Sequence, residues 1–173
     1  MGGTITAEAL GSLDRPGFVD AVGFVAEHSP WVAETAYERR PFADVEAVAA
    51  AFRGAIEDAP AGRQLALIRA HPDLAGKLAL AGDLTEASAS EQASAGLDRL
   101  TPTELERFTQ ANALYRERFA IPFVICVREH AKESIAAAFD ARLANDAEVE
   151  RATAIDQIAR IMRLRLLDAL CTT

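Results

Sequence analysis

The pair His71-Pro72 joins the side chain best suited to acid-base chemistry to a residue that restricts its backbone. Histidine exchanges a proton near neutral pH more readily than other side chains. Proline disfavours the α conformation at the residue before it, so the helix that carries Leu65 and Ile68 should break at His71. The sequence therefore predicts a proton-transferring histidine at a junction. The alternative is a histidine that only satisfies a helix end.

A polar cluster follows at Ser88-Ala89-Ser90-Glu91-Gln92. Its Ser-x-x-Glu spacing matches a capping box, so Ser88 and Glu91 could simply start a helix. A capping box normally precedes an apolar stripe, whereas the residues after Gln92 are small. The cluster is therefore also compatible with a helix start that faces a ligand, and both interpretations stay open.

Arg165 lies in the last helical segment, where cationic side chains otherwise project toward the polar side. At about 100° per residue it falls between Ile158 and Ile161 on the apolar arc. An arginine directed into an apolar region needs an anionic partner, either a protein carboxylate or a ligand carboxylate. The alternative is that its long side chain reaches back to the surface.

Asn112 raises the same question in an earlier helix, which begins at the Thr101 capping box. The angular arithmetic places it inside the stripe formed by Phe108 and Tyr115, so its amide should be buried and must find partners. A neighbouring backbone, such as that of the connector at Pro122, is one candidate partner. A ligand is the other.

Helices must position these side chains, because alanine is abundant, aromatic residues make up 6% and alternating β-branched residues are rare. Helix starts are marked by Asp14, by Asp44, by the capping box from Thr101 to Glu104, and by Asn145 or Asp146. Residues 81–95 are the least core-like part of the chain. Residues 122–127 alone resemble a strand, but they have no evident partner and are better interpreted as a buried connector.

These patterns predict an all-α fold, a single compact domain of roughly seven to nine helices over residues 1–173. We expect residues 1–10 to be a flexible N-terminus. The formal net charge of -8 and the absence of a basic run argue against nucleic-acid and membrane partners. The longest apolar stretch, residues 119–127, is far shorter than the roughly 20 residues of a membrane-spanning helix. A cytoplasmic location is therefore expected, with Cys126 and Cys171 as reduced thiols.

Metal and cofactor signatures are missing from the sequence. The three histidines are widely separated, and no HExxH, paired CxxC or EF-hand loop occurs. Glycine-rich nucleotide motifs and the GxSxG of serine hydrolases do not occur either. We therefore expect no metal site and no cofactor.

Several blocks of the sequence together carry a resemblance to one family. They are Leu67-Ile68-Arg69-Ala70-His71-Pro72-Asp73-Leu74-Ala75-Gly76-Lys77, Ser88-x-x-Glu91-Gln92, Ala95-Gly96-Leu97-Asp98, Asn112-x-x-Tyr115, Ile121-Pro122-Phe123-Val124-Ile125-Cys126-Val127 and Leu164-Arg165-Leu166. In combination they resemble the 2-oxo-4-hydroxy-4-carboxy-5-ureidoimidazoline (OHCU) decarboxylases over nearly the whole chain. One departure is Ala120-Ile121-Pro122-Phe123, where many members have Gly-Phe-Pro-Phe.

The resemblance implies a helical, cofactor-free enzyme of urate degradation that decarboxylates a ureidoimidazoline and yields (S)-allantoin. It also implies a homodimer. By position it makes His71 the catalytic histidine and matches Arg165 to an arginine on the last helix, and we expect Glu91 and Arg165 to take part in catalysis with His71. The substrate-binding positions that it assigns are Pro72, Ser88, Gln92, Phe123, Val124, Ile125, Cys126 and Val127. Two alternatives remain at this point: a non-enzymatic helical interaction module, and a decarboxylase or lyase that acts on a related ureide.

Overall fold

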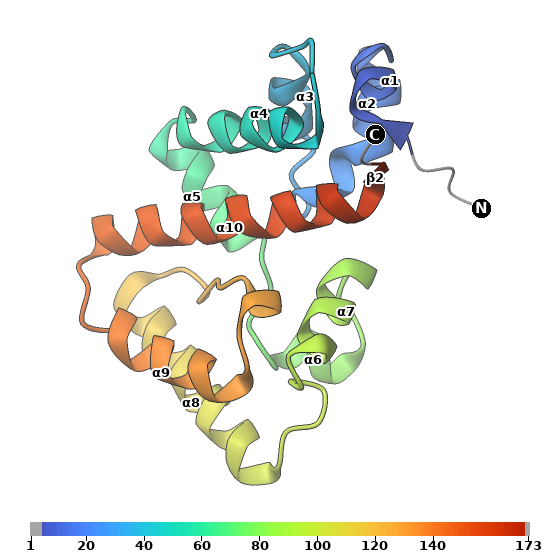
Figure 1. Cartoon of the computed structure of the whole chain (residues 1–173). Coiled ribbons are helices and arrows are strands. Elements are labelled where there is room, and N and C mark those ends of the chain that lie inside the picture. The colour runs from blue at the N-terminus through green and yellow to red at the C-terminus, as the bar shows by residue number, and fades with distance from the viewer. Residues whose placement is uncertain (1–4, 172–173) are drawn as a thin grey trace. The chain divides into compact units, whose positions relative to one another are not determined.

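The computed structural model describes residues 5–171, and within them helices are the main secondary structure (Figure 1). This part contains ten α-helices, two 3-10 turns and one pair of two-residue strands. The predicted all-α fold is confirmed. The sequence patterns did not reveal the five-residue helices α1 (Ala7–Gly11) and α6 (Lys77–Ala81), which are too short to display an apolar period.

The described residues form two compact units. The first contains residues 5–70 and 158–171, and the second contains residues 71–157. Helix α10 (Ala147–Ala169) contributes to both, because the boundary falls after Gln157. The elements of the first unit, besides α1 and the end of α10, are β1 (Ile5–Thr6), α2 (Arg15–Val22), η1 (Gly23–Val25), α3 (Trp31–Tyr37), α4 (Val45–Glu57), α5 (Ala61–Arg69) and β2 (Leu170–Cys171).

Predicted helix caps are present in the first unit. Asp14 accepts a hydrogen bond from the Gly17 N–H at 2.9 Å and begins α2, and Asp44 accepts one from Ala47 at 2.8 Å and begins α4. Helix α3 packs on α4. Phe18 is fully buried in this core, with its ring centroid 5.5 Å from that of Tyr37.

Residues 5–10, which we expected to be flexible, are structured. Strand β1 pairs in parallel with β2 through Ile5 and Leu170. The Thr6 hydroxyl accepts a hydrogen bond from Ala9 and caps α1, whose Leu10 is fully buried. Pairing, capping and burial together order this segment. Residues 1–4, which belong to the same expectation, lie outside the described part.

The second unit contains α6, α7 (Glu86–Ser94), α8 (Pro102–Phe119), η2 (Val127–Glu129), α9 (Lys132–Arg142) and the start of α10. Helices α8 and α9 lie side by side (Figure 1). The capping box of α8 is present, since the Thr101 N–H donates to Glu104 at 2.8 Å and the Glu104 N–H donates to Thr101 at 3.3 Å. Lys132 pairs with Glu104 at 2.6 Å, and this contact, together with the hydrogen bonds to Thr101, lowers the pKa of the Glu104 carboxyl to about 2.

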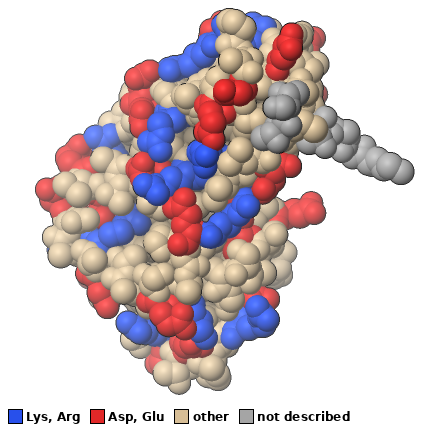
Figure 2. Space-filling model, viewed as in Figure 1, with Lys and Arg blue, Asp and Glu red and all other residues tan. Residues whose placement is uncertain are grey.

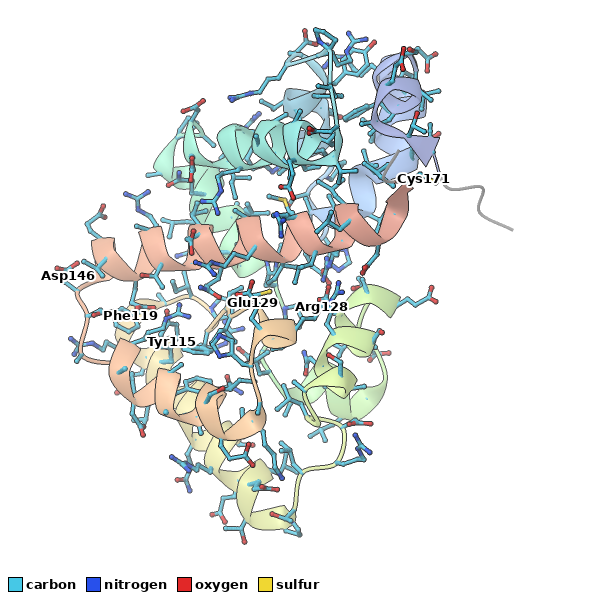
Figure 3. The ribbon with its side chains drawn as sticks, viewed as in Figure 1. Tyr115, Phe119, Arg128, Glu129, Asp146 and Cys171 are labelled. Atoms are coloured by element: carbon cyan, nitrogen blue, oxygen red, sulfur yellow. The ribbon has the colours of Figure 1, made fainter. Side chains whose placement is uncertain are left out.

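The segment at residues 121–127 is entirely buried and forms no strand, as predicted for a connector. Aromatic rings hold it in place. Phe123 stacks on Phe139 of α9 at 3.8 Å between centroids, and the ring of Tyr115 meets Phe123 edge-on at 5.2 Å. Tyr115 and Phe119 lie next to each other on α8, with ring centroids 4.8 Å apart (Figure 3).

The surface carries both signs of charge. Figure 2 shows Lys and Arg side chains interspersed with Asp and Glu over the face in view. Within residues 5–171, no helix combines the length and apolar character that crossing a bilayer requires. Both cysteines are free thiols, Cys126 buried and Cys171 partly exposed.

Candidate active site

His71 lies where the chain enters the second unit. Helix α5 ends at Arg69, two residues before His71, so the predicted break ahead of Pro72 is confirmed. The residue His71 is 6% exposed, and Pro72 is partly exposed. A buried histidine at a helix break, beside a partly exposed proline, has the setting that the sequence predicted.

Polar side chains hold the turn that follows His71. The Ala75 N–H donates to Gln92 Oε1 at 3.0 Å, and Asn112 Nδ2 donates to the Leu74 carbonyl at 2.8 Å. Arg116 pairs with Asp73 at 2.9 Å. Ala75 has a φ of 48°, a left-handed conformation that an alanine adopts only when its surroundings fix it. These contacts from α7 and α8 fix the backbone leading away from His71.

Asn112 therefore bonds to a backbone group, which was one of the two alternatives. Its partner is Leu74 in the turn after His71 rather than the connector at Pro122. Asn112 Oδ1 is buried and accepts no hydrogen bond from the described residues. The sequence indicated that this amide is buried, but only the tertiary structure could reveal which backbone it reaches.

Helix α7 begins three residues earlier than the Ser88-x-x-Glu91 pattern indicated. Thr85 is its cap and accepts a hydrogen bond from the Ser88 N–H at 3.3 Å, so the interpretation of Ser88 as a capping residue is wrong. Ser88 and Gln92, four residues apart, are the buried residues of this helix, and Glu91 is partly exposed. Helix α7 thus buries a polar face instead of an apolar one.

This polar helix also packs against η2, at the end of the connector. Burial is the main cause that raises the pKa of the Cys126 thiol to about 11, and the Glu129 and Glu91 carboxylates act in the same direction. The second unit therefore brings together three predicted parts of the site: the His71 turn, helix α7 and residues 123–127.

Two side chains hold the connector's backbone where it passes α9 and α10. Arg142 Nη1 donates to the Val124 carbonyl at 2.7 Å, and the Cys126 N–H donates to Gln157 Oε1 at 2.9 Å. Ile125 lies between these two contacts. Within the described residues its own N–H and C=O have no hydrogen-bond partner.

Arg142 belongs to a buried network that the sequence analysis missed. Its guanidinium pairs with Glu150 at 2.9 Å, and the Tyr115 hydroxyl also donates to Glu150. Burial, and then the bond to Glu150, raises the pKa of Tyr115. A signal was available, since Arg142 follows Ile135 and Phe139 at helical spacing and is buried with them.

Arg165 lies in the first unit, whereas the other predicted site residues lie in the second. It is 4% exposed, so the inward orientation is confirmed and the surface-reaching alternative is wrong. Its Nη1 donates to Glu27 at 2.9 Å and to the Val25 carbonyl at 3.2 Å. The anionic partner visible in the structure is thus a protein carboxylate.

Comparison with known proteins adds to this geometry. The family model described as OHCU decarboxylase matches residues 11–167. The 2-oxo-4-hydroxy-4-carboxy-5-ureidoimidazoline decarboxylase of Haloferax volcanii is 43% identical over 164 residues, which cover 95% of each chain. The Mus musculus protein of the same name is 37% identical over 93% of this chain and 90% of its own.

A crystal structure of (S)-allantoin synthase superposes with a TM-score of 0.76 and 28% identity. The match covers 96% of this chain but only 54% of that one, so this chain spans about half the length of the synthase. Both sequence and fold therefore give the same assignment: the chain belongs to the OHCU decarboxylase family.

Proposed function

We propose that this protein is a cofactor-independent carboxy-lyase that converts 2-oxo-4-hydroxy-4-carboxy-5-ureidoimidazoline to (S)-allantoin in urate degradation. Family membership over residues 11–167 supports the reaction class. The observation that carries the proposal is the buried polar face of α7, bonded through Gln92 to the turn that follows His71. A helix face of this kind carries hydrogen-bonding groups suited to the donors and acceptors of a ureide ring.

The substrate supplies the electron sink for this reaction. When the bond between the ring carbon and its carboxylate breaks, the electron pair moves toward the neighbouring imidazoline C=N, and carbon dioxide leaves. The carbon that lost the carboxylate is then part of an enol, and a proton is added to the neighbouring ureido-bearing carbon, which becomes the stereocentre of allantoin. The hydroxyl becomes the ring carbonyl as its proton passes to the ring nitrogen that received the electron pair. The protein must orient the ring, exclude water and deliver the proton to one face of the ureido-bearing carbon.

His71, Glu91 and Arg165 are the catalytic residues in this proposal. His71 assists loss of the carboxylate and delivers the proton, which its intrinsic acid-base range suits. Glu91 accepts hydrogen bonds from ureido and ring N–H groups. Arg165 binds an anionic or carbonyl oxygen through its guanidinium, which carries five N–H donors.

Gln92 and the connector bind the substrate together with Pro72 and Ser88. Because Gln92 Oε1 accepts from Ala75, its Nε2 donor is the end suited to a substrate carbonyl. Phe123 to Val127 present backbone groups, and the N–H and C=O of Ile125 match the donor and acceptor pattern of a ureide. The substrate therefore meets both amide side chains and peptide groups.

The decisive experiment is to add the purified protein to freshly generated OHCU and follow circular dichroism. We expect rapid formation of optically active (S)-allantoin. A racemic product formed at the uncatalysed rate would favour the non-enzymatic interaction module. Turnover of a related ureide but not of OHCU would favour the alternative decarboxylase or lyase.

The proposal includes a homodimer located in the cytoplasm. Light scattering after size-exclusion chromatography should give twice the 18.5 kDa of the chain. A mass equal to one chain would remove the homodimer from the proposal without affecting the reaction.

A further inference from the structure

We propose that Arg142 and Gln157 are positioning residues that aim the two peptide groups of Ile125 at the substrate. The inference rests on the proposed function and deepens it. Neither side chain needs to touch the substrate. Both act by holding the connector in one conformation.

The connector needs such support because it has no secondary structure of its own. Residues 121–126 belong to no helix or strand, although every one of them is buried. Buried peptide groups outside helices and sheets are usually bonded by side chains, turns or water, and here α9 supplies Arg142 for Val124 and α10 supplies Gln157 for Cys126. These two hydrogen bonds add to the ring packing of Phe123 and fix the peptide groups on either side of Ile125.

Because the peptide bonds are trans, these two contacts also fix the directions of the Ile125 N–H and C=O. The Val124 C=O and the Ile125 N–H belong to one peptide plane and point in opposite directions. Arg142 holds that C=O, so the Ile125 N–H is directed away from Arg142. By the same reasoning Gln157 holds the Cys126 N–H, and the Ile125 C=O is directed away from Gln157. Ile125 therefore presents its N–H as a donor and its C=O as an acceptor, each in a fixed direction.

Arg142 is itself held rigidly. It makes three hydrogen bonds to Glu150, whose side chain is fully buried, and its guanidinium lies 4.3 Å from the centroid of the Phe123 ring. A guanidinium held in this way is suited to fixing a carbonyl and poorly suited to following a substrate. Its removal would leave Glu150 buried without its cation, so Gln157, neutral and partly exposed, is the better residue to test.

The experiment compares Gln157→Leu, which removes the acceptor for the Cys126 N–H, with Gln157→Glu, which retains an acceptor of equal reach. Thr153→Val is the matched control, because it removes a hydrogen bond from the same helix, the 2.8 Å bond to Val149. Steady-state decarboxylation and (S)-allantoin affinity are measured for each variant, and urea unfolding establishes that each is folded.

We expect Gln157→Leu to raise KM and weaken (S)-allantoin binding about tenfold, with a smaller change in kcat. Gln157→Glu should stay within about twofold of wild type, as should the Thr153 control. A folded Gln157→Leu with wild-type KM, or equal impairment of both Gln157 variants, overturns the positioning role while the wild type still decarboxylates. A wild type without decarboxylase activity overturns the proposed function and this inference with it.

Discussion

Arg165 and Glu27 form an ion pair with 2.9 Å between Nη1 and Oε2, and their side chains are only 4% and 2% exposed. The buried positive charge of Arg165 is therefore balanced by a carboxylate of the protein itself. A protein that buries an arginine in this way can use it toward an anion without leaving it unpaired when the site is empty.

Removing the carboxylate of this pair should be costly. We expect Glu27→Gln to reduce the free energy of unfolding by about 3–5 kcal/mol, because the buried Arg165 would lose the carboxylate bonded to its Nη1. The matched control is Glu38→Gln, which breaks the exposed pair with Arg15 and should cost less than about 1 kcal/mol. Urea titration measures both. Equal losses would contradict the account of Arg165.

The second buried pair should behave in the same way. Arg142→Met leaves Glu150 buried and uncompensated, and we expect a loss of about 3–5 kcal/mol in unfolding free energy. The double variant Arg142→Met/Glu150→Leu should recover part of that loss, because no buried charge remains. A single variant that unfolds at the wild-type urea midpoint would show that the network is not needed for stability.

Acid should weaken the start of α8. The pKa of Glu104 is lowered to about 2, chiefly by the hydrogen bond from Lys132. A lowered pKa adds stability above the unfolded value near 4.5, and this stability is lost as the pH falls toward 2. Glu104→Gln keeps the capping box and removes the charge. It should therefore be less stable than wild type at pH 7, with the gap in urea midpoint closing near pH 2. A difference in urea midpoint between Glu104→Gln and wild type that does not change with pH would contradict the lowered pKa of Glu104.

The two thiols should differ in reactivity. Burial raises the pKa of Cys126 to about 11, so at pH 8 it remains a protonated, inaccessible thiol, whereas Cys171 is partly exposed. We expect native protein at pH 8 to take up one equivalent of iodoacetamide, at Cys171, and unfolded protein to take up two. Peptide mass spectrometry locates the label. Native labelling of Cys126 at the rate of Cys171 would disprove the burial argument.

Local signals in the sequence predicted much of this structure, because they depend on near neighbours. The caps at Asp14 and Asp44 and the capping box at Thr101 act within one helical turn. The inward direction of Arg165 followed from helical angles alone. The segment at residues 122–127 was correctly expected to be a connector because the sequence contains no evident partner strand.

Partners that are distant in the sequence could not be predicted. Asn112 bonds to Leu74, and Arg165 bonds to Glu27, across 38 and 138 residues of chain. Thr85 was missed as the α7 cap because Ser88 offered a complete capping-box pattern close by. These contacts are decided by tertiary packing, on which helical periodicity carries no information.

In the proposed reaction His71 delivers the proton that sets the stereochemistry of allantoin. The most direct test follows circular dichroism while His71→Ala acts on fresh OHCU, with His130→Ala as a control for loss of a histidine elsewhere in the second unit. We predict that His71→Ala loses at least about 100-fold in the rate of (S)-allantoin formation, the scale of general acid-base catalysis, while His130→Ala keeps the wild-type rate. Formation of (S)-allantoin by His71→Ala at the wild-type rate would contradict the claim.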